Sequence, residues 1–240
     1  MTCVNNEATA ILMLLEGRKD VVFYYALFKK IFKFNDINFT EHPALRDIIL
    51  GFGNRRVKIL KRDKVEIAII DCRGFDNLKR ILEDIINRML IGAINHINRM
   101  IIVGDLDRNP LESIRGKLSS LKLKINQVNS NEYLLEDINV YINILSQGLE
   151  GGRMTGELED YVFLISKEQY DVKEEIINCI DRIINREIDS KEASVIYSAL
   201  VVRDQGMEAF ISHLLNEKDE NELKSKMEDL VRSLKEILES

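Results

Sequence analysis

The chain has 240 residues, of which 45% are hydrophobic and 31% charged, as in ordinary globular proteins rather than disordered or membrane ones. Its net charge of -6 argues against a general binder of polyanions, although bound cations could neutralise the acidic site of a nucleic-acid enzyme. The longest apolar runs fall far short of the ~20 residues in a membrane-spanning helix, so we expect no membrane association.

Cysteine and histidine are few and scattered. The three residues of each type form no CxxC pair and show no spacing typical of zinc ligands. No secretory signal is visible at the start of the sequence. We therefore expect a cytoplasmic protein in which oxygen atoms hold any metal.

Apolar strands and helices alternate over the first two-thirds of the chain. Strands are predicted at 8–17, 65–72, 99–107, 124–128 and 139–148, and helices at 19–34, 43–50, 73–92 and 110–121. Pro110 suits the first turn of its helix, where a missing N–H costs nothing. The strands are too apolar for a half-exposed sheet, so the pattern predicts an α/β fold with a mainly parallel central sheet flanked by helices.

The pattern changes to helices alone after about residue 156. Helices are predicted at 157–166, 172–187, 191–201, 206–215 and 221–238. We expect an α/β domain over 1–165 and an all-helical C-terminal extension over 166–240 that packs on it. Leucine and methionine form a stripe on the last helix, which indicates core packing first and a homodimer interface second. The glycine-rich segment 148–156 is interpreted as a flexible loop over the edge of the site.

Acidic residues end two of the predicted parallel strands. Glu16 follows the first strand, and Asp105 with Asp107 follow the third. The C-terminal ends of parallel strands share one edge of a sheet, where such folds bind their ligands. Converging carboxylates repel one another unless a cation lies between them, and Mg²⁺ or Mn²⁺ suits such a site. Asp107 could instead form a turn before Asn109-Pro110.

These segments together resemble the Toprim domain. The relevant segments are "EGRKD" at 16–20, "GFDNLKRIL" from Gly74, "DLD" at 105–107 and "GELED" at 156–160. In this order they are similar to small stand-alone Toprim proteins of archaea and bacteria, which are related to the Toprim domains of OLD-family nucleases. The resemblance covers roughly residues 8–164 and is more specific for fold than for substrate.

The resemblance implies roles for individual acids. Glu16 would be a general acid/base and metal ligand, and Asp105 and Asp107 would form the Mg²⁺-binding pair. By analogy with two-metal nucleases, candidates for a second metal are Asp20, Glu157, Glu159 and Asp160. The acids of "GELED" could equally favour the macrodipole at a helix N-terminus and need no metal.

A basic stretch stands out against the acidic average. Residues 55–64, "RRVKILKRDK", read either as a solvated connector before a strand or as a patch that steers phosphate. The residues expected to contact nucleic acid, DNA or RNA, are Arg18, Lys19, Arg55, Arg56, Lys58, Lys61 and Arg62.

The sequence thus predicts a metal-dependent phosphotransfer enzyme that acts on nucleic acid, most simply a nuclease. The alternative is a catalytically inactive Toprim module that binds metal and nucleic acid or a partner protein. A third reading is a haloacid-dehalogenase-like phosphatase, because "DLDRNPLES" resembles that family's DxDGTxxxS, but Arg108-Asn109 replace its Gly-Thr. No tyrosine can be tied to covalent cleavage, and the P-loop motif of full-length OLD proteins is absent.

Overall fold

The computed structural model describes residues 9–52, 57–95, 97–121, 123–167, 171–202 and 205–239. Its strands are β1 (Thr9–Leu15), β2 (Asn35–Asp36), β3 (Val57–Arg62), β4 (Val65–Asp71), β5 (Arg99–Asp105), β6 (Ile125–Gln127), β7 (Glu132–Leu135) and β8 (Val140–Gln147). Its helices are α1 (Arg18–Lys30), α2 (Pro43–Phe52), α3 (Phe75–Leu90), α4 (Pro110–Ser120), α5 (Leu158–Lys167), α6 (Asp171–Ile184), α7 (Ser190–Val202), α8 (Gly206–Glu217), α9 (Glu220–Lys226) and α10 (Glu228–Glu239), with a 3₁₀ turn at Leu106–Arg108.

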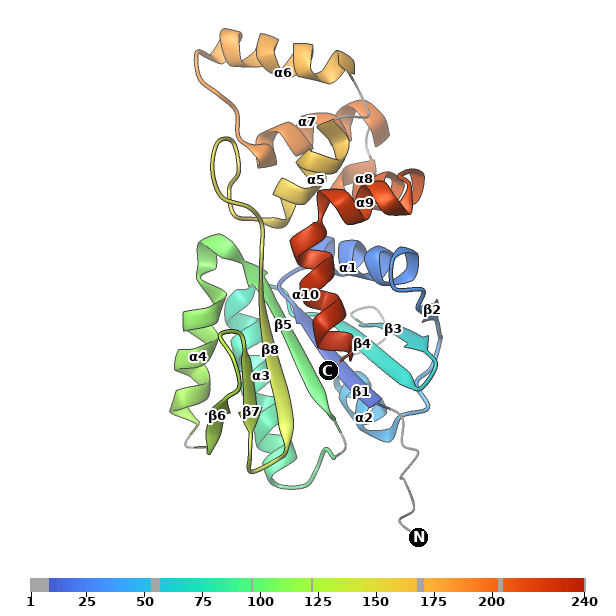
Figure 1. The fold of residues 1–240 in the computed structure, drawn as a ribbon, viewed down its shortest axis with the longest axis vertical. Helices are drawn as coiled ribbons and strands as arrows, with labels where there is room; N and C mark the ends of the chain where they lie inside the picture. The colour runs from blue at the N-terminus through green and yellow to red at the C-terminus, as the bar shows by residue number, and fades with distance from the viewer. Residues whose placement is uncertain are drawn as a thin grey trace.

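All of the described strands belong to one sheet, in the order β2-β3-β4-β1-β5-β8-β7-β6 (Figure 1). The central strands β4, β1, β5 and β8 are parallel to their neighbours within this group, whereas β2 and β3 at one edge and β7 and β6 at the other pair antiparallel. The predicted α/β fold is confirmed, and its parallel part is the centre of a mixed sheet. The sequence reading omitted β2, β3 and β7.

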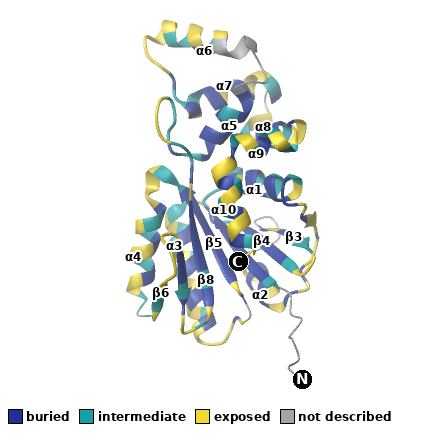
Figure 2. Ribbon diagram, viewed as in Figure 1, coloured by how far each residue is buried: buried dark blue, intermediate teal, exposed yellow. Residues whose placement is uncertain are grey.

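Two hydrophobic cores lie on opposite faces of the sheet. Helices α2, α3 and α4 cover one face, and α1 with α10 covers the other (Figure 1). Every residue of β1 after Thr9 is buried, because helices cover the sheet on both faces at this strand (Figure 2). Alternate residues of β1 therefore enter different cores: Met13 belongs to the core with α1, and Leu12 to the core with α3.

The C-terminal helices share the core of α1 rather than building a separate one. The predicted boundary at residue 165 falls inside α5, whose packing partners include α7, α8 and α9, so the helical region begins with α5. The helix predicted over 221–238 is divided at Met227, where φ is -124° and ψ is 33°. The predicted stripe nevertheless packs into the core: Leu223, Met227, Leu230 and Leu234 are buried.

From Val57 on, the basic stretch is a strand followed by a tight turn rather than a solvated connector. Residues from Val57 form β3, which pairs with β4 along its length, and Val57, Ile59 and Leu60 are buried. In "VKILK" the exposed Lys58 stands between the buried Val57 and Ile59, a pattern that indicates a strand, here next to the short edge strand β2. In the described part of the chain, no helix combines the length and apolar character needed to cross a membrane.

Candidate active site at the carboxyl edge of the sheet

The parallel register brings polar residues to one edge of the sheet. Leu15 of β1 is level with Asp71 of β4 and with Val103 of β5, so Glu16 and Asp105 follow at neighbouring strand ends. Asp105 pairs in turn with Gln147, the last residue of β8. The C-terminal ends of four adjacent strands therefore each supply a carboxylate or an amide at this edge.

A cleft of about 540 Å³ opens at this edge, between the sheet and the C-terminal helices. The acidic residues that line it are Glu16, Asp20, Asp71, Asp105, Glu157 and Glu159. The basic residues that line it are Arg18, Lys19, Arg73, Arg108 and Lys191. We call it the acidic cleft. Arg73 and Arg108 directly follow the predicted strands 65–72 and 99–107, a signal that was not used to propose them, whereas Lys191 reaches the cleft from α7 and no local pattern indicates this.

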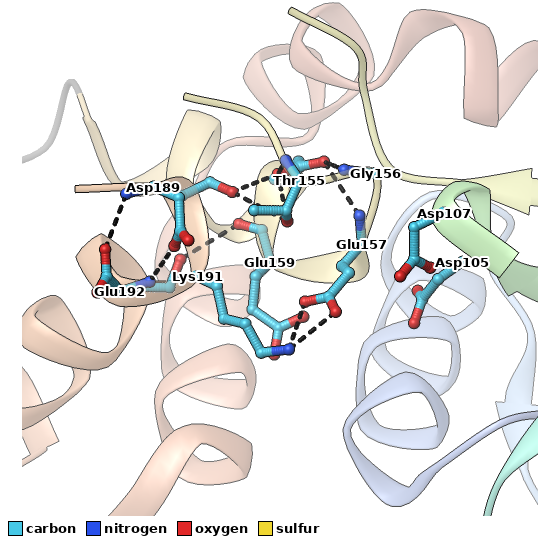
Figure 3. Close-up of polar contacts among 12 residues, drawn as sticks. Asp105, Asp107, Thr155, Gly156, Glu157, Glu159, Asp189, Lys191 and Glu192 are labelled. Carbon is cyan, nitrogen blue, oxygen red and sulfur yellow. Dashed lines mark hydrogen bonds and ion pairs between the residues drawn. The ribbon is translucent and has the colours of Figure 1, made fainter. Parts of the chain in front are cut away.

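Glu16 lies among other carboxylates. Burial is the main cause of its raised pKa, and the charges of Asp105, Asp107 and Glu157 add to the effect, while Arg108 opposes it. Glu16 and Asp105 both line the cleft, whereas Asp107 acts on Glu16 through its charge and is not among the lining residues. Glu16 Oε2 is buried and has no hydrogen-bond partner among the described residues. Asp107 lies on the 3₁₀ turn after β5, beside Asp105, and its side chain is exposed at the rim (Figure 3).

Gln147 joins two of the carboxylates. It is fully buried, and its Nε2 donates to Asp105 Oδ1 at 2.7 Å and to Asp20 Oδ1 at 2.8 Å. Asp20 Oδ2 also accepts from the backbone N–H of Gly17 at 2.8 Å, which fixes the Glu-Gly turn after β1. Burial raises the pKa of Asp105 to about 7 and that of Asp20 to about 6, although the Gln147 bond lowers both.

Lysine side chains neutralise the acids that come from the α5 segment. Lys191 Nζ lies 2.8 Å from Glu157 Oε1 and 2.7 Å from Oε2 (Figure 3). This contact is the first cause of the raised pKa of Lys191. Lys19 forms an ion pair with the buried Glu159. The two pairs link α7 to the segment before α5, and α1 to α5, across the cleft.

Asp160 has a different surrounding from the other acids of "GELED". It is fully buried, and its carboxylate accepts hydrogen bonds from backbone N–H groups of residues 149, 155, 156 and 157 and from the hydroxyls of Thr155 and Ser190. Both oxygens are occupied by these donors, and Asp160 does not line the cleft. We therefore leave Asp160 out of the proposed metal ligands.

The glycine-rich loop that Asp160 holds also contacts the DxD turn. The carbonyl of Gly156 accepts from the N–H of Leu106 at 2.7 Å and from that of Asp107 at 3.4 Å. The segment 148–156 was predicted to be a flexible loop over the site edge. It does lie at the edge, but the backbone N–H groups of residues 149 and 155 donate to Asp160, which ties the two ends of the loop together and fixes its place beside Asp107.

The basic residues expected to contact nucleic acid lie in different places. Arg18 and Lys19 line the acidic cleft, and Arg18 Nε pairs with Glu208 Oε2 at 3.0 Å. Lys58 is exposed near the start of β3, level with Ile69 of β4. Arg55 and Arg56 lie outside the described residues.

Lys61 and Arg62 lie at the opposite end of β4 from the carboxylates, because β3 runs antiparallel to β4. Lys61 pairs with Glu41 and the buried Glu66, and Arg62 donates to the carbonyl of Phe32. Both make structural contacts away from the cleft, so we leave them out of the proposed interface.

The fit of a divalent cation can be judged from the donors present. Among the described residues, no three His, Cys, Asp or Glu side chains already form a metal-binding group. Mg²⁺ does not need such a cage, because it keeps several waters and takes one or two carboxylates with substrate phosphates. The unpartnered Glu16 Oε2 and the raised pKa of Asp105 indicate carboxylates that a cation would stabilise. The donor set therefore fits a hard dication.

Comparison with known proteins shows the fold. No protein-family model matches the chain, and no curated protein matches it. The crystal structure of a hypothetical protein from Pyrococcus horikoshii OT3 is similar, with a TM-score of 0.75 and 16% sequence identity over 96% of this chain and 99% of its own. The likeness extends over nearly the whole of both chains. At this identity it establishes a shared architecture, including the helical region, and assigns no activity.

Proposed function

We propose that the acidic cleft is a Toprim-type metal site that hydrolyses phosphodiester bonds of nucleic acid, which would make the protein a nuclease. The observation that carries this proposal is the meeting of Glu16 and Asp105 at adjacent strand ends, with Glu16 Oε2 buried and unpartnered in the described structure. Carboxylates that repel one another and have raised pKa values gain stability when a dication replaces their protons.

The residues divide into two candidate ligand sets. Glu16, Asp105 and Asp107 would hold one Mg²⁺ or Mn²⁺, and Asp20, Glu157 and Glu159 would supply a second. When bound, such ions supply positive charge to the phosphate and a more acidic water.

The chain's own groups support the same chemistry around these ligands. Gln147 keeps the carboxylates of Asp105 and Asp20 oriented. Arg108 and Arg73 at the mouth of the cleft are exposed cations that can bind the phosphate backbone. Glu16, with its raised pKa, can accept a proton from water at Oε2.

A second function has one observation in its favour. Lys19 and Lys191 already neutralise Glu159 and Glu157, so the second ligand set is occupied by the chain's own cations. An inactive module would bind one metal at Glu16 and Asp105 together with nucleic acid or a partner protein, without turnover.

Incubation of the protein with Mg²⁺ or Mn²⁺ and a panel of single- and double-stranded DNA and RNA distinguishes the nuclease from the inactive module. We expect cleavage that falls by about a hundredfold or more in Glu16→Gln and in Asp105→Asn. Asp84→Asn, an exposed acid on α3, is the matched control and should keep full activity. Cleavage that survives both substitutions would contradict the proposal. Metal binding by calorimetry with no cleavage of any substrate would establish the inactive module.

A further inference from the structure

A second groove, of about 620 Å³, runs beside the acidic cleft. It lies between α1 and α8 and reaches Lys58 at the start of β3. Val22, Tyr25, Ala26 and Ala209 give it an apolar and aromatic floor. We call it the α1 groove.

The α1 groove adjoins the acidic cleft. Arg18 lines the cleft and pairs at 3.0 Å with Glu208, which lines the groove. From Arg18 the groove residues Val22, Tyr25 and Lys29 follow at helical spacing on one face of α1. At 1.5 Å per residue this face extends the cleft by about 16 Å. A chain that leaves the cleft past Arg18 would therefore enter the groove.

Two lysine side chains lie over the Tyr25 ring, and Lys29 Nζ also donates a long hydrogen bond of 3.4 Å to the Tyr25 hydroxyl. Lys29 Nζ lies 5.1 Å and Lys58 Nζ 5.3 Å from the ring centroid, and both lysines are exposed. Neither forms an ion pair with a carboxylate in the described part of the chain. The neighbouring Lys30 differs, since it donates to main-chain carbonyls at the end of α8. Contacts of exposed ammonium groups with an aromatic ring are weak, so ring and ammonium groups are available to a ligand.

Acidic groups also face this surface. Glu208 is paired with Arg18, and Asp36 lies close enough to the Tyr25 hydroxyl to help raise its pKa, after the larger effect of burial. The groove therefore presents an aromatic ring with two lysines that form no ion pair among the described residues, beside a cleft that we propose acts on phosphodiesters. An aromatic ring close to two cations suits an unpaired base with a phosphate on either side. A duplex covers its base faces by internal stacking and could not use the ring.

We propose that the α1 groove binds single-stranded nucleic acid, with a base stacked on Tyr25 and its phosphates on Lys29 and Lys58. The strand continues past Arg18 into the acidic cleft. The binding of the strand is inferred from the α1 groove alone. What happens to the strand in the acidic cleft rests on the proposed function. Together they make single-stranded nucleic acid the substrate class.

Fluorescence anisotropy in EDTA measures binding without cleavage. The probe is a labelled single-stranded DNA of about 15 nucleotides, compared with its duplex and with a polyglutamate peptide. We expect Tyr25→Leu to weaken binding of the single strand by about tenfold or more, and Tyr25→Phe to retain it. Lys58→Gln should weaken binding and reduce the slope of log K against log salt by about 0.7. Lys124→Gln, an exposed lysine beside the opposite sheet edge, is the matched control.

Each outcome decides the inference. Equal binding by wild type, Tyr25→Leu and Lys58→Gln would overturn it, as would equal binding of duplex and single strand or binding of polyglutamate alone. Should Tyr25→Leu fail to melt cooperatively, the comparison of Lys58→Gln with Lys124→Gln decides. If the wild type cleaves but binding does not depend on Tyr25, the inferred role of the α1 groove is wrong and the proposed nuclease function stands. If binding depends on Tyr25 but no cleavage occurs, the α1 groove binds the strand and the proposed nuclease function is wrong.

Discussion

One amide group fixes two carboxylates at the sheet edge: Gln147 Nε2 donates to Asp105 Oδ1 at 2.7 Å and to Asp20 Oδ1 at 2.8 Å. Asp105 comes from β5 and Asp20 from α1, so the fully buried Gln147 ties the two elements together at the cleft. Because both bonds favour the charged carboxylates, Gln147 opposes the effect of burial on their pKa values.

Gln147→Leu removes these bonds with little change in side-chain volume. We expect the pKa values of Asp105 and Asp20 to rise further, because burial would then act without the opposing hydrogen bond. Binding of Mg²⁺ or Mn²⁺ near pH 7 should weaken by about tenfold and recover at higher pH, as a charge-assisted hydrogen bond of about 1.5 kcal/mol predicts. Titration calorimetry at several pH values measures this metal affinity, and Ser146→Ala, a variant of the exposed neighbour, is the control. An unchanged pH profile of affinity would contradict the assigned role.

The acidic cleft should make stability depend on pH. The pKa is raised to about 7 at Asp105 and to about 6 at Asp20, above the ordinary value of 3.8. Since the folded state then binds more protons than the unfolded state, the metal-free free energy of unfolding should fall as pH rises from about 4 to about 7. Added Mg²⁺ should raise Tm near pH 8 and not near pH 5, because protonated carboxyls cannot bind it.

Thermal melts with and without Mg²⁺ at constant ionic strength measure this effect. In Asp105→Asn the decline between about pH 4 and pH 7 should be shallower, because one of the two titrating groups is gone. Equal stabilisation by Mg²⁺ at both ends of the pH range would place the ion away from these carboxylates.

Asp160→Asn should destabilise the loop over the cleft. The amide nitrogen of asparagine would face N–H donors that now meet a carboxylate, leaving buried groups unpaired. We expect a loss of about 2 kcal/mol or more, and Tm falls by about 2 to 4 °C per kcal/mol in a chain of this size. Glu150→Gln, on the same loop but exposed, should leave Tm unchanged. Calorimetric melts compare the two, and equal Tm values would contradict the role of Asp160.

Alanine substitutions at Gly148 and Gly151 distinguish the effect of a steric clash from that of backbone strain. Both have positive φ, +100° and +95°, so alanine costs conformational energy at either site. A Cβ on Gly148 would lie 2.2 Å from the carbonyl carbon of Gly156, whereas one on Gly151 meets no atom within 4 Å. Gly148→Ala should therefore lower Tm clearly more than Gly151→Ala does. Similar melts for the two variants would show that the segment around Gly156 can move aside.

Local patterns predicted much of the fold and part of the site. Continuous apolar runs such as "IIVG" before Asp105 predicted buried parallel strands, because only a sheet covered on both faces removes such runs from water. The position of Glu16 and Asp105 at strand ends then predicted their approach. The strand in "VKILK" was missed because its lysines suggested solvent, although Lys58 between two apolar residues is compatible with a strand near the edge of a sheet.

The sequence by itself determined which residues form the buried strands and that acids follow two of them, since period and apolarity are properties of the local chain. Tertiary structure alone decided that Gln147 lies between Asp20 and Asp105, that Lys19 and Lys191 pair with Glu159 and Glu157, and that Asp160 serves the loop. These partners lie far apart along the chain or in separate elements. Whether a carboxylate meets an ammonium group, an amide or an N–H donor depends on which distant segments pack around it, and no local pattern records that packing.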